Sequence, residues 1–73
     1  MKKSPSLIGI CHVWIKNVKL LDGGSNKTFE PGTIGTLEVT EIGTDGQVIN
    51  ANFYPAGSKG FGSCIAPTWE YVR

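Results

Sequence analysis

Glycine and proline interrupt this chain so often that little room is left for a long helix. Ten glycines and four prolines occur among 73 residues, and no long window carries apolar residues at helical spacing. Between these breakers the chain is rich in valine, isoleucine, threonine and aromatic residues, which favour strands. The sequence therefore predicts an all-β chain of short strands.

The clearest element is a hairpin around Asp45-Gly46, a dipeptide typical of turns between antiparallel strands. Before the turn, residues 33–42 alternate: Leu37 and Val39 point one way, and the polar residues between them point the other. After the turn, residues 47–54 resume the alternation. It predicts inward positions for Ile49, Ala51 and Phe53 and outward positions for Asn50 and Asn52.

Three further strands are expected around the hairpin. Residues 7–21 suffice for a bent strand or two short ones, and residues 63–66 and 69–72 are short candidates that follow a glycine-rich loop at 55–62. Five short strands cannot form two layered sheets. We expect one domain, residues 1–73 with a flexible segment at 1–6, folded as a small five-stranded barrel or a strongly bent antiparallel sheet.

The order of these segments resembles that of SH3-like barrels. Phe29-Glu30-Pro31-Gly32 stands where that architecture has a hydrophobic-x-x-Gly turn, and residues 66–72 resemble its closing Pro-x-x-Tyr-Val segment with one extra residue. Residues 32–37, followed by an acidic hairpin and residues 52–54, are similar to the opening of small SH3-like accessory subunits. The resemblance spans residues 13–73 and implies a fold rather than a ligand.

Two departures separate the chain from peptide-binding SH3 domains. Those domains carry an aromatic and acidic motif in their first loop, where this chain has Asp22-Gly23-Gly24-Ser25. They also carry a tryptophan just after the acidic hairpin loop, whereas this chain has none between Trp14 and Trp69. The resemblance therefore does not imply a groove for proline-rich peptides.

The charges nearly balance, with a formal net charge of +1, which is unlike a protein that grips nucleic acid by bulk charge. They are nevertheless segregated. The first 27 residues hold five lysines and one aspartate, whereas residues 30–45 hold four acidic side chains and no basic one. This pattern is either two faces suited to an oppositely charged partner or ordinary solvated surface.

The two cysteines, Cys11 and Cys64, are too few for a disulfide framework. We expect two separate buried thiols. A disulfide between them stays open as the alternative, since closing so long a loop would stabilise a small domain by about 4 kcal/mol.

The N-terminus resembles a secretory signal only superficially. Two lysines precede a short apolar run that ends at Cys11, but the run is too short, and Ile10 stands where lipoprotein processing requires a small residue. No segment approaches the roughly 20 apolar residues of a membrane span. We therefore expect a cytoplasmic protein without membrane attachment.

No residue constellation points to catalysis. His12 is the single histidine, so any catalytic cysteine–histidine pair must include it. Cys64 is a possible partner. The simpler interpretation is that the histidine is half-exposed, the thiol is buried, and the two do not interact. With Cys11 these residues supply at most three ligands, and a structural zinc site needs four. Glu38 lies on an outward face, where solvent keeps the pKa of a carboxyl ordinary. We expect no enzymatic activity, no metal and no cofactor.

Aromatic side chains suggest a binding surface. Of the seven aromatic residues, Trp14, Tyr54 and Phe61 are placed outward or in a loop, and Lys59 accompanies Phe61. Exposed aromatic residues are frequent at interface hot spots, although they equally suit the open ends of a barrel. We predict that Trp14, Tyr54, Lys59 and Phe61 bind a partner.

The leading hypothesis is a non-catalytic protein-interaction module. Its size suits a small inhibitor or adaptor of a larger host protein or complex, of the kind that phages and mobile elements encode. The alternatives are a nucleic-acid-binding small barrel, which would use the basic first segment and the 57–62 loop, and an accessory SH3-like subunit of a larger enzyme. An open strand edge would also allow a homodimer.

Overall fold

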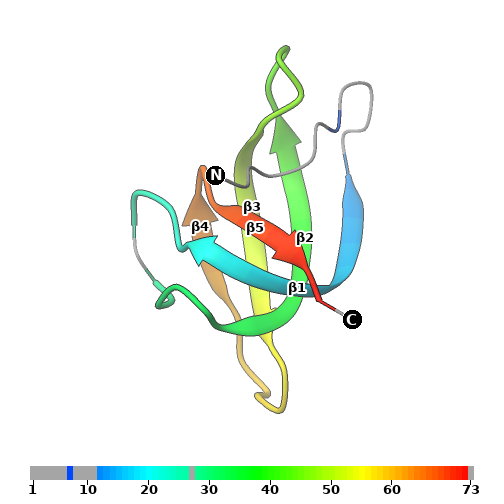
Figure 1. Cartoon of the computed structure of the whole chain (residues 1–73). Coiled ribbons are helices and arrows are strands. Elements are labelled where there is room, and N and C mark those ends of the chain that lie inside the picture. Colours follow the sequence, from blue (N-terminus) through cyan, green and yellow to red (C-terminus); the bar gives the residue numbers. More distant parts are fainter. Residues whose placement is uncertain (1–6, 8–11, 27, 73) are drawn as a thin grey trace.

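The computed structural model describes residue 7, residues 12–26 and residues 28–72. These residues form five strands and no helix, and the strands build a single antiparallel sheet (Figure 1). The strands are β1 (Val13–Asp22), β2 (Ile34–Ile42), β3 (Val48–Pro55), β4 (Gly62–Ile65) and β5 (Thr68–Tyr71).

The strand order is β4-β3-β2-β1-β5, with β4 and β5 at the two edges, so the sheet is not closed into a barrel. The predicted all-β class is confirmed, and an antiparallel sheet describes the pairing better than a closed barrel. The described residues hold no helix of the length and apolar character that crossing a membrane requires.

The predicted hairpin is confirmed as β2 and β3. Its turn is three residues long: the Gly43 N–H donates to the Gln47 carbonyl at 2.8 Å, and the Gly46 N–H donates back to the Gly43 carbonyl at 3.0 Å. Gly46 has a φ of 82°, a left-handed conformation that glycine adopts without strain. Leu37 then faces Phe53 directly in the ladder.

One inward position was predicted wrongly. Ala51 and Phe53 are buried, but Ile49 is exposed and Val48 is buried in its place. The cause is a pair of register irregularities in the ladder between β2 and β3: the second lies between the Glu41–Asn50 and Ile42–Val48 pairs, where β3 carries Ile49 as an extra residue. Such a shift moves side chains to the opposite face of a strand.

β1 bends, so that its first part pairs with β2 and its last part pairs with β5. Its pairing with β2 shifts register between Ile15 and Val18, where Asn17 has a φ of 56°. The Asn17 carbonyl accepts a hydrogen bond from the Val72 N–H at 2.6 Å, just beyond β5. A bulge sharpens the twist of a strand, and β1 curves visibly towards its pairing with β5 (Figure 1).

The curvature gathers one core from all five strands. Trp69 of β5 is fully buried in the same cluster as Leu37 and Phe53 from the central hairpin. Leu37 and Val39, which were predicted to point to the same side, and Ile15 of β1 are also buried there. The cluster comprises Ile15, Val18, Leu20, Leu37, Val39, Val48, Ala51, Phe53, Cys64 and Trp69.

Cys64 is fully buried, as predicted, and burial raises the pKa of its thiol. Cys11 lies outside the described residues, as does the segment 1–6 that was predicted to be flexible. The structure gives Cys64 as a free thiol, in line with the prediction of separate thiols, and the predicted burial of Cys11 stays a prediction.

The loop between β1 and β2 covers the outer edge of β4. The Ser25 N–H donates to the Ile65 carbonyl at 2.7 Å, and the side chains of Asn26 and Thr28 donate to the Ser63 carbonyl. These carbonyls are therefore not available to a further strand, so the open edge that we expected is occupied on this side. The homodimer stays a prediction.

Gly24 allows this loop to approach so closely. Its φ is 89°, and a Cβ atom at this position would lie 2.1 Å from the Ile65 carbonyl oxygen. Gly57 offers a matched comparison, because its φ of 78° is similar but its Cβ would meet nothing within 4 Å.

We expect Gly24→Ala to lower the free energy of unfolding by at least about 2 kcal/mol more than Gly57→Ala, since it adds a steric clash to the same backbone strain. Urea denaturation of both variants followed by tryptophan fluorescence measures the difference. Equal losses in the two variants would show that the loop does not pack on β4 as described.

Candidate functional site

Three of the four residues predicted to bind a partner lie together on the outward face of the sheet. The rings of Trp14 on β1 and Tyr54 on β3 are 5.2 Å apart between centroids and tilted by 44°. Tyr54 in turn stacks on Phe61, which directly precedes β4, at 4.8 Å and 24°. We call Trp14, Tyr54 and Phe61 the aromatic row.

The row is built by strand pairing. Trp14 lies opposite Glu38 across β1 and β2, and Tyr54 lies opposite Thr36 across β2 and β3. The two rings are therefore diagonal neighbours across β2, a separation that large side chains can span. Trp14 is 51% exposed and Phe61 57%.

Lys59, the fourth predicted residue, is exposed in the loop between β3 and β4, two residues before Phe61. This loop turns at Gly57, and the Ser58 N–H donates to the Pro55 carbonyl at 3.2 Å. Lys59 is thus close to Phe61 in the sequence, but it is not part of the stacked rings.

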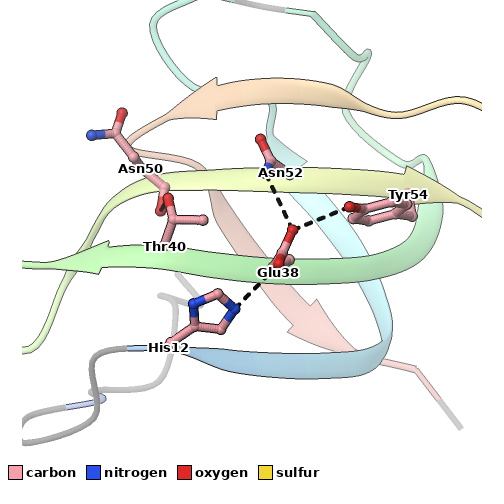
Figure 2. Close-up of polar contacts among 6 residues, drawn as sticks. All are labelled: His12, Glu38, Thr40, Asn50, Asn52 and Tyr54. Carbon is pink, nitrogen blue, oxygen red and sulfur yellow. Dashed lines mark hydrogen bonds and ion pairs between the residues drawn. The ribbon is translucent and has the colours of Figure 1, made fainter.

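A polar network lies beside the aromatic row and was not predicted. Glu38, Asn52 and Ser63 are direct partners across β2, β3 and β4. The Ser63 hydroxyl donates to Asn52 Oδ1 at 3.2 Å, and Asn52 Nδ2 donates to Glu38 Oε1 at 3.2 Å. The Tyr54 hydroxyl donates to the same Glu38 oxygen at 3.1 Å (Figure 2).

The second carboxylate oxygen of Glu38 faces His12. His12 Nε2 lies 3.2 Å from Glu38 Oε2, and the two side chains are 58% and 15% exposed (Figure 2). Glu38 on β2 therefore contacts both neighbouring segments. Its Oε1 accepts hydrogen bonds from side chains of β3, and its Oε2 contacts His12, the residue before β1.

These contacts keep Glu38 ionised. The hydrogen bond from Asn52 lowers the pKa of the Glu38 carboxyl, partial desolvation opposes it, and the Tyr54 and His12 contacts lower the pKa further. The pKa of Tyr54 is raised, first by desolvation and then by its bond to Glu38. The expectation of an ordinary pKa for Glu38 was wrong, because the strand register places donors against an outward carboxylate.

The possible pairing of His12 with Cys64 does not form. His12 is exposed on the outward side beside Glu38, whereas Cys64 is fully buried in the core on the other side of the sheet. In the described part of the chain, no three histidine, cysteine, aspartate or glutamate side chains gather as a metal site would require.

An open apolar depression of about 700 Å³ lies at the other end of the hairpin, next to its turn. Ile49 and Ile65, both partly exposed, contribute to its walls together with the turn itself. No aromatic side chain is among the residues that line it.

Comparisons with protein-family models, with curated proteins and with solved structures find no match to this chain.

We expect Glu38→Gln to destabilise the protein at pH 7 and to have progressively less effect in acid. A carboxyl whose pKa is lower in the folded state stabilises the fold fully above its unfolded value, near 4.5, and loses that stabilisation as the pH falls through the folded pKa. Urea denaturation at pH 7 and at several values below 4.5 measures this.

The control is the same substitution made in an Asn52→Ala background. Because Asn52 is the main cause of the lowered pKa, the pH dependence of the Glu38→Gln effect should be smaller there. An effect of the same size at every pH in both backgrounds would contradict the prediction.

Proposed function

We propose that this chain is a non-catalytic protein-interaction module, a small inhibitor or adaptor that docks on a larger protein through the aromatic row. The observation that carries the proposal is the packing of three aromatic rings from separate segments of the chain, with the two outer rings, Trp14 and Phe61, more than half exposed and Tyr54 half-buried between them. Exposed aromatic residues gathered in one place are typical of interface hot spots.

The position of the row argues against a purely structural role. The neighbours of Trp14 and Tyr54 along their strands, Ile15 and Phe53, are buried in the core, so the two rings point to the opposite face of the sheet. They therefore do not cover an open end of the core, which was the alternative interpretation of their exposure.

The row is also well ordered for binding. Each outer ring packs on Tyr54, and the hydroxyl of Tyr54 is held by Glu38. Side chains that are already fixed lose little conformational entropy when a partner covers them, which favours affinity. In this proposal, Lys59 contacts an acidic group of the partner at the edge of the interface.

The proposal includes an SH3-like architecture. Five antiparallel strands in the order β5-β1-β2-β3-β4, with a bent β1 shared between β2 and β5, support it, although the sheet is open. The fold analogy still implies no proline-peptide groove, since the chain lacks the first-loop motif and the tryptophan of peptide-binding SH3 domains.

Nucleic-acid binding is the second candidate, because stacked aromatic rings on a sheet also accept bases. An ionised carboxylate beside the row opposes it by repelling phosphate. A titration with generic single-stranded DNA and RNA at several salt concentrations tests it, and strongly salt-dependent binding would favour this candidate over the first.

We expect Trp14→Ala and Phe61→Ala each to weaken binding of the natural partner about tenfold or more, as removal of hot-spot rings does. Tyr71→Ala is the matched control, because Tyr71 is as exposed as Phe61, at 57%, but lies on β5 away from the row.

Immobilised wild-type protein and the three variants would be exposed to an extract of the producing cells, and retained proteins identified by mass spectrometry. The affinity of a purified candidate would then be measured. Equal binding by all four proteins would refute the aromatic row as the interface, and a partner that stays bound through purification would indicate an accessory subunit.

A further inference from the structure

Glu38 has an acceptor position left over beside the aromatic row. A carboxylate offers about four acceptor positions. Among the described residues, Oε1 accepts from Asn52 and Tyr54, whereas Oε2 contacts only His12. Within the described part of the chain, Oε2 thus has one acceptor position without a donor, and the side chain of His12, which contacts the other, is 58% exposed.

The surroundings of this oxygen combine charge with aromatic faces. Trp14 lies directly opposite Glu38 on the neighbouring strand, and Tyr54 touches its other oxygen. The Asn52 and Ser63 bonds hold the carboxylate in place. Tyr54 is already covered by Trp14 and Phe61, so an incoming group would stack on the exposed Trp14 ring, within reach of an ionised and positioned carboxylate.

Arginine matches this combination better than other side chains. Its guanidinium is planar, weakly hydrated and always charged, so that it can stack on an aromatic face and donate to a carboxylate at the same time. The ammonium of lysine is compact and strongly hydrated and cannot stack. Anionic groups would be repelled by Glu38 and by Glu41, which is exposed on the same strand.

We propose that the partner inserts an arginine side chain against the exposed ring of Trp14, with its guanidinium donating to Glu38 Oε2. Phe61 extends the apolar surface for the residues that flank this arginine. The inference rests on the proposed function and names the recognition chemistry of that same surface.

The first test titrates ¹⁵N-labelled protein with the tripeptide acetyl-Gly-Arg-Gly-amide at constant ionic strength. We expect saturable shifts of the Trp14 indole N–H and of the Asn52 side-chain amide. A matched peptide with neutral citrulline should bind at least about tenfold more weakly, since it loses the charge-assisted hydrogen bond. A peptide with lysine should also bind more weakly, because its ammonium is strongly hydrated and does not stack on the ring. Absence of these shifts, or equal shifts with citrulline, would overturn the proposal.

The second test uses variants of the protein. Glu38→Gln should weaken the arginine peptide about tenfold, whereas His12→Ala, which frees a position on Oε2, should leave its affinity unchanged or increase it. The amide spectrum of each variant reports whether it is folded. Should Glu38→Gln prove unfolded, Tyr54→Phe, which keeps the ring and the carboxylate, should still bind the peptide, and failure to bind would count against the proposal.

Failure of this inference is distinguishable from failure of the proposed function. If Trp14→Ala and Phe61→Ala abolish binding of the natural partner while Glu38→Gln and the arginine peptide have no effect, the interaction surface stands and the arginine site is wrong. If oligonucleotides rather than the peptide shift the NMR signals of the aromatic row, the arginine site and the protein-interaction proposal are both wrong. The nucleic-acid candidate then takes their place.

Discussion

The register of β2 against β3 is the constraint on which the rest of this structure depends. Leu37 opposite Phe53 places the central apolar pair in the core, and Glu38 opposite Asn52, one position along, places a carboxylate against an amide donor on the outward face. Because a strand alternates its faces with a period of two, a slip of one residue would place Glu38 and Phe53 on the same face, so that either the carboxylate would be buried or the ring would be exposed. The same register therefore determines both the core on one face of the sheet and the candidate site on the other.

The same register explains how so small a sheet can hold an ordered surface. Trp14, Glu38, Asn52 and Ser63 form a single row of directly paired residues across four strands. Side-chain hydrogen bonds join Glu38, Asn52 and Ser63, and Trp14 packs on Tyr54, so the outward face is ordered by cross-strand contacts rather than by a second layer. Stacking of Tyr54 between Trp14 and Phe61 extends this order to the loop before β4.

The remaining parts of the chain complete the core and cover an edge. The bulge at Asn17 bends β1 so that Trp69 joins the core, and the loop after β1 occupies the outward carbonyls of Ser63 and Ile65. Gly24 permits that contact, because any side chain there would meet the Ile65 carbonyl. A domain of this size exposes much of its chain, and covering a strand edge limits unwanted pairing.

By itself, the sequence determined the all-β class, the hairpin around Asp45-Gly46 and the outward positions of Trp14, Tyr54 and Phe61, because breakers, turn residues and alternation are local properties of a chain. Only the tertiary structure decided the exposure of Ile49, the depressed pKa of Glu38 and the stacking of the three rings. Each of these depends on which residues face one another across strands, and bulges set that register. Alternation shows which face a residue occupies, but the partner on the next strand gives Glu38 its donors and the aromatic row its order.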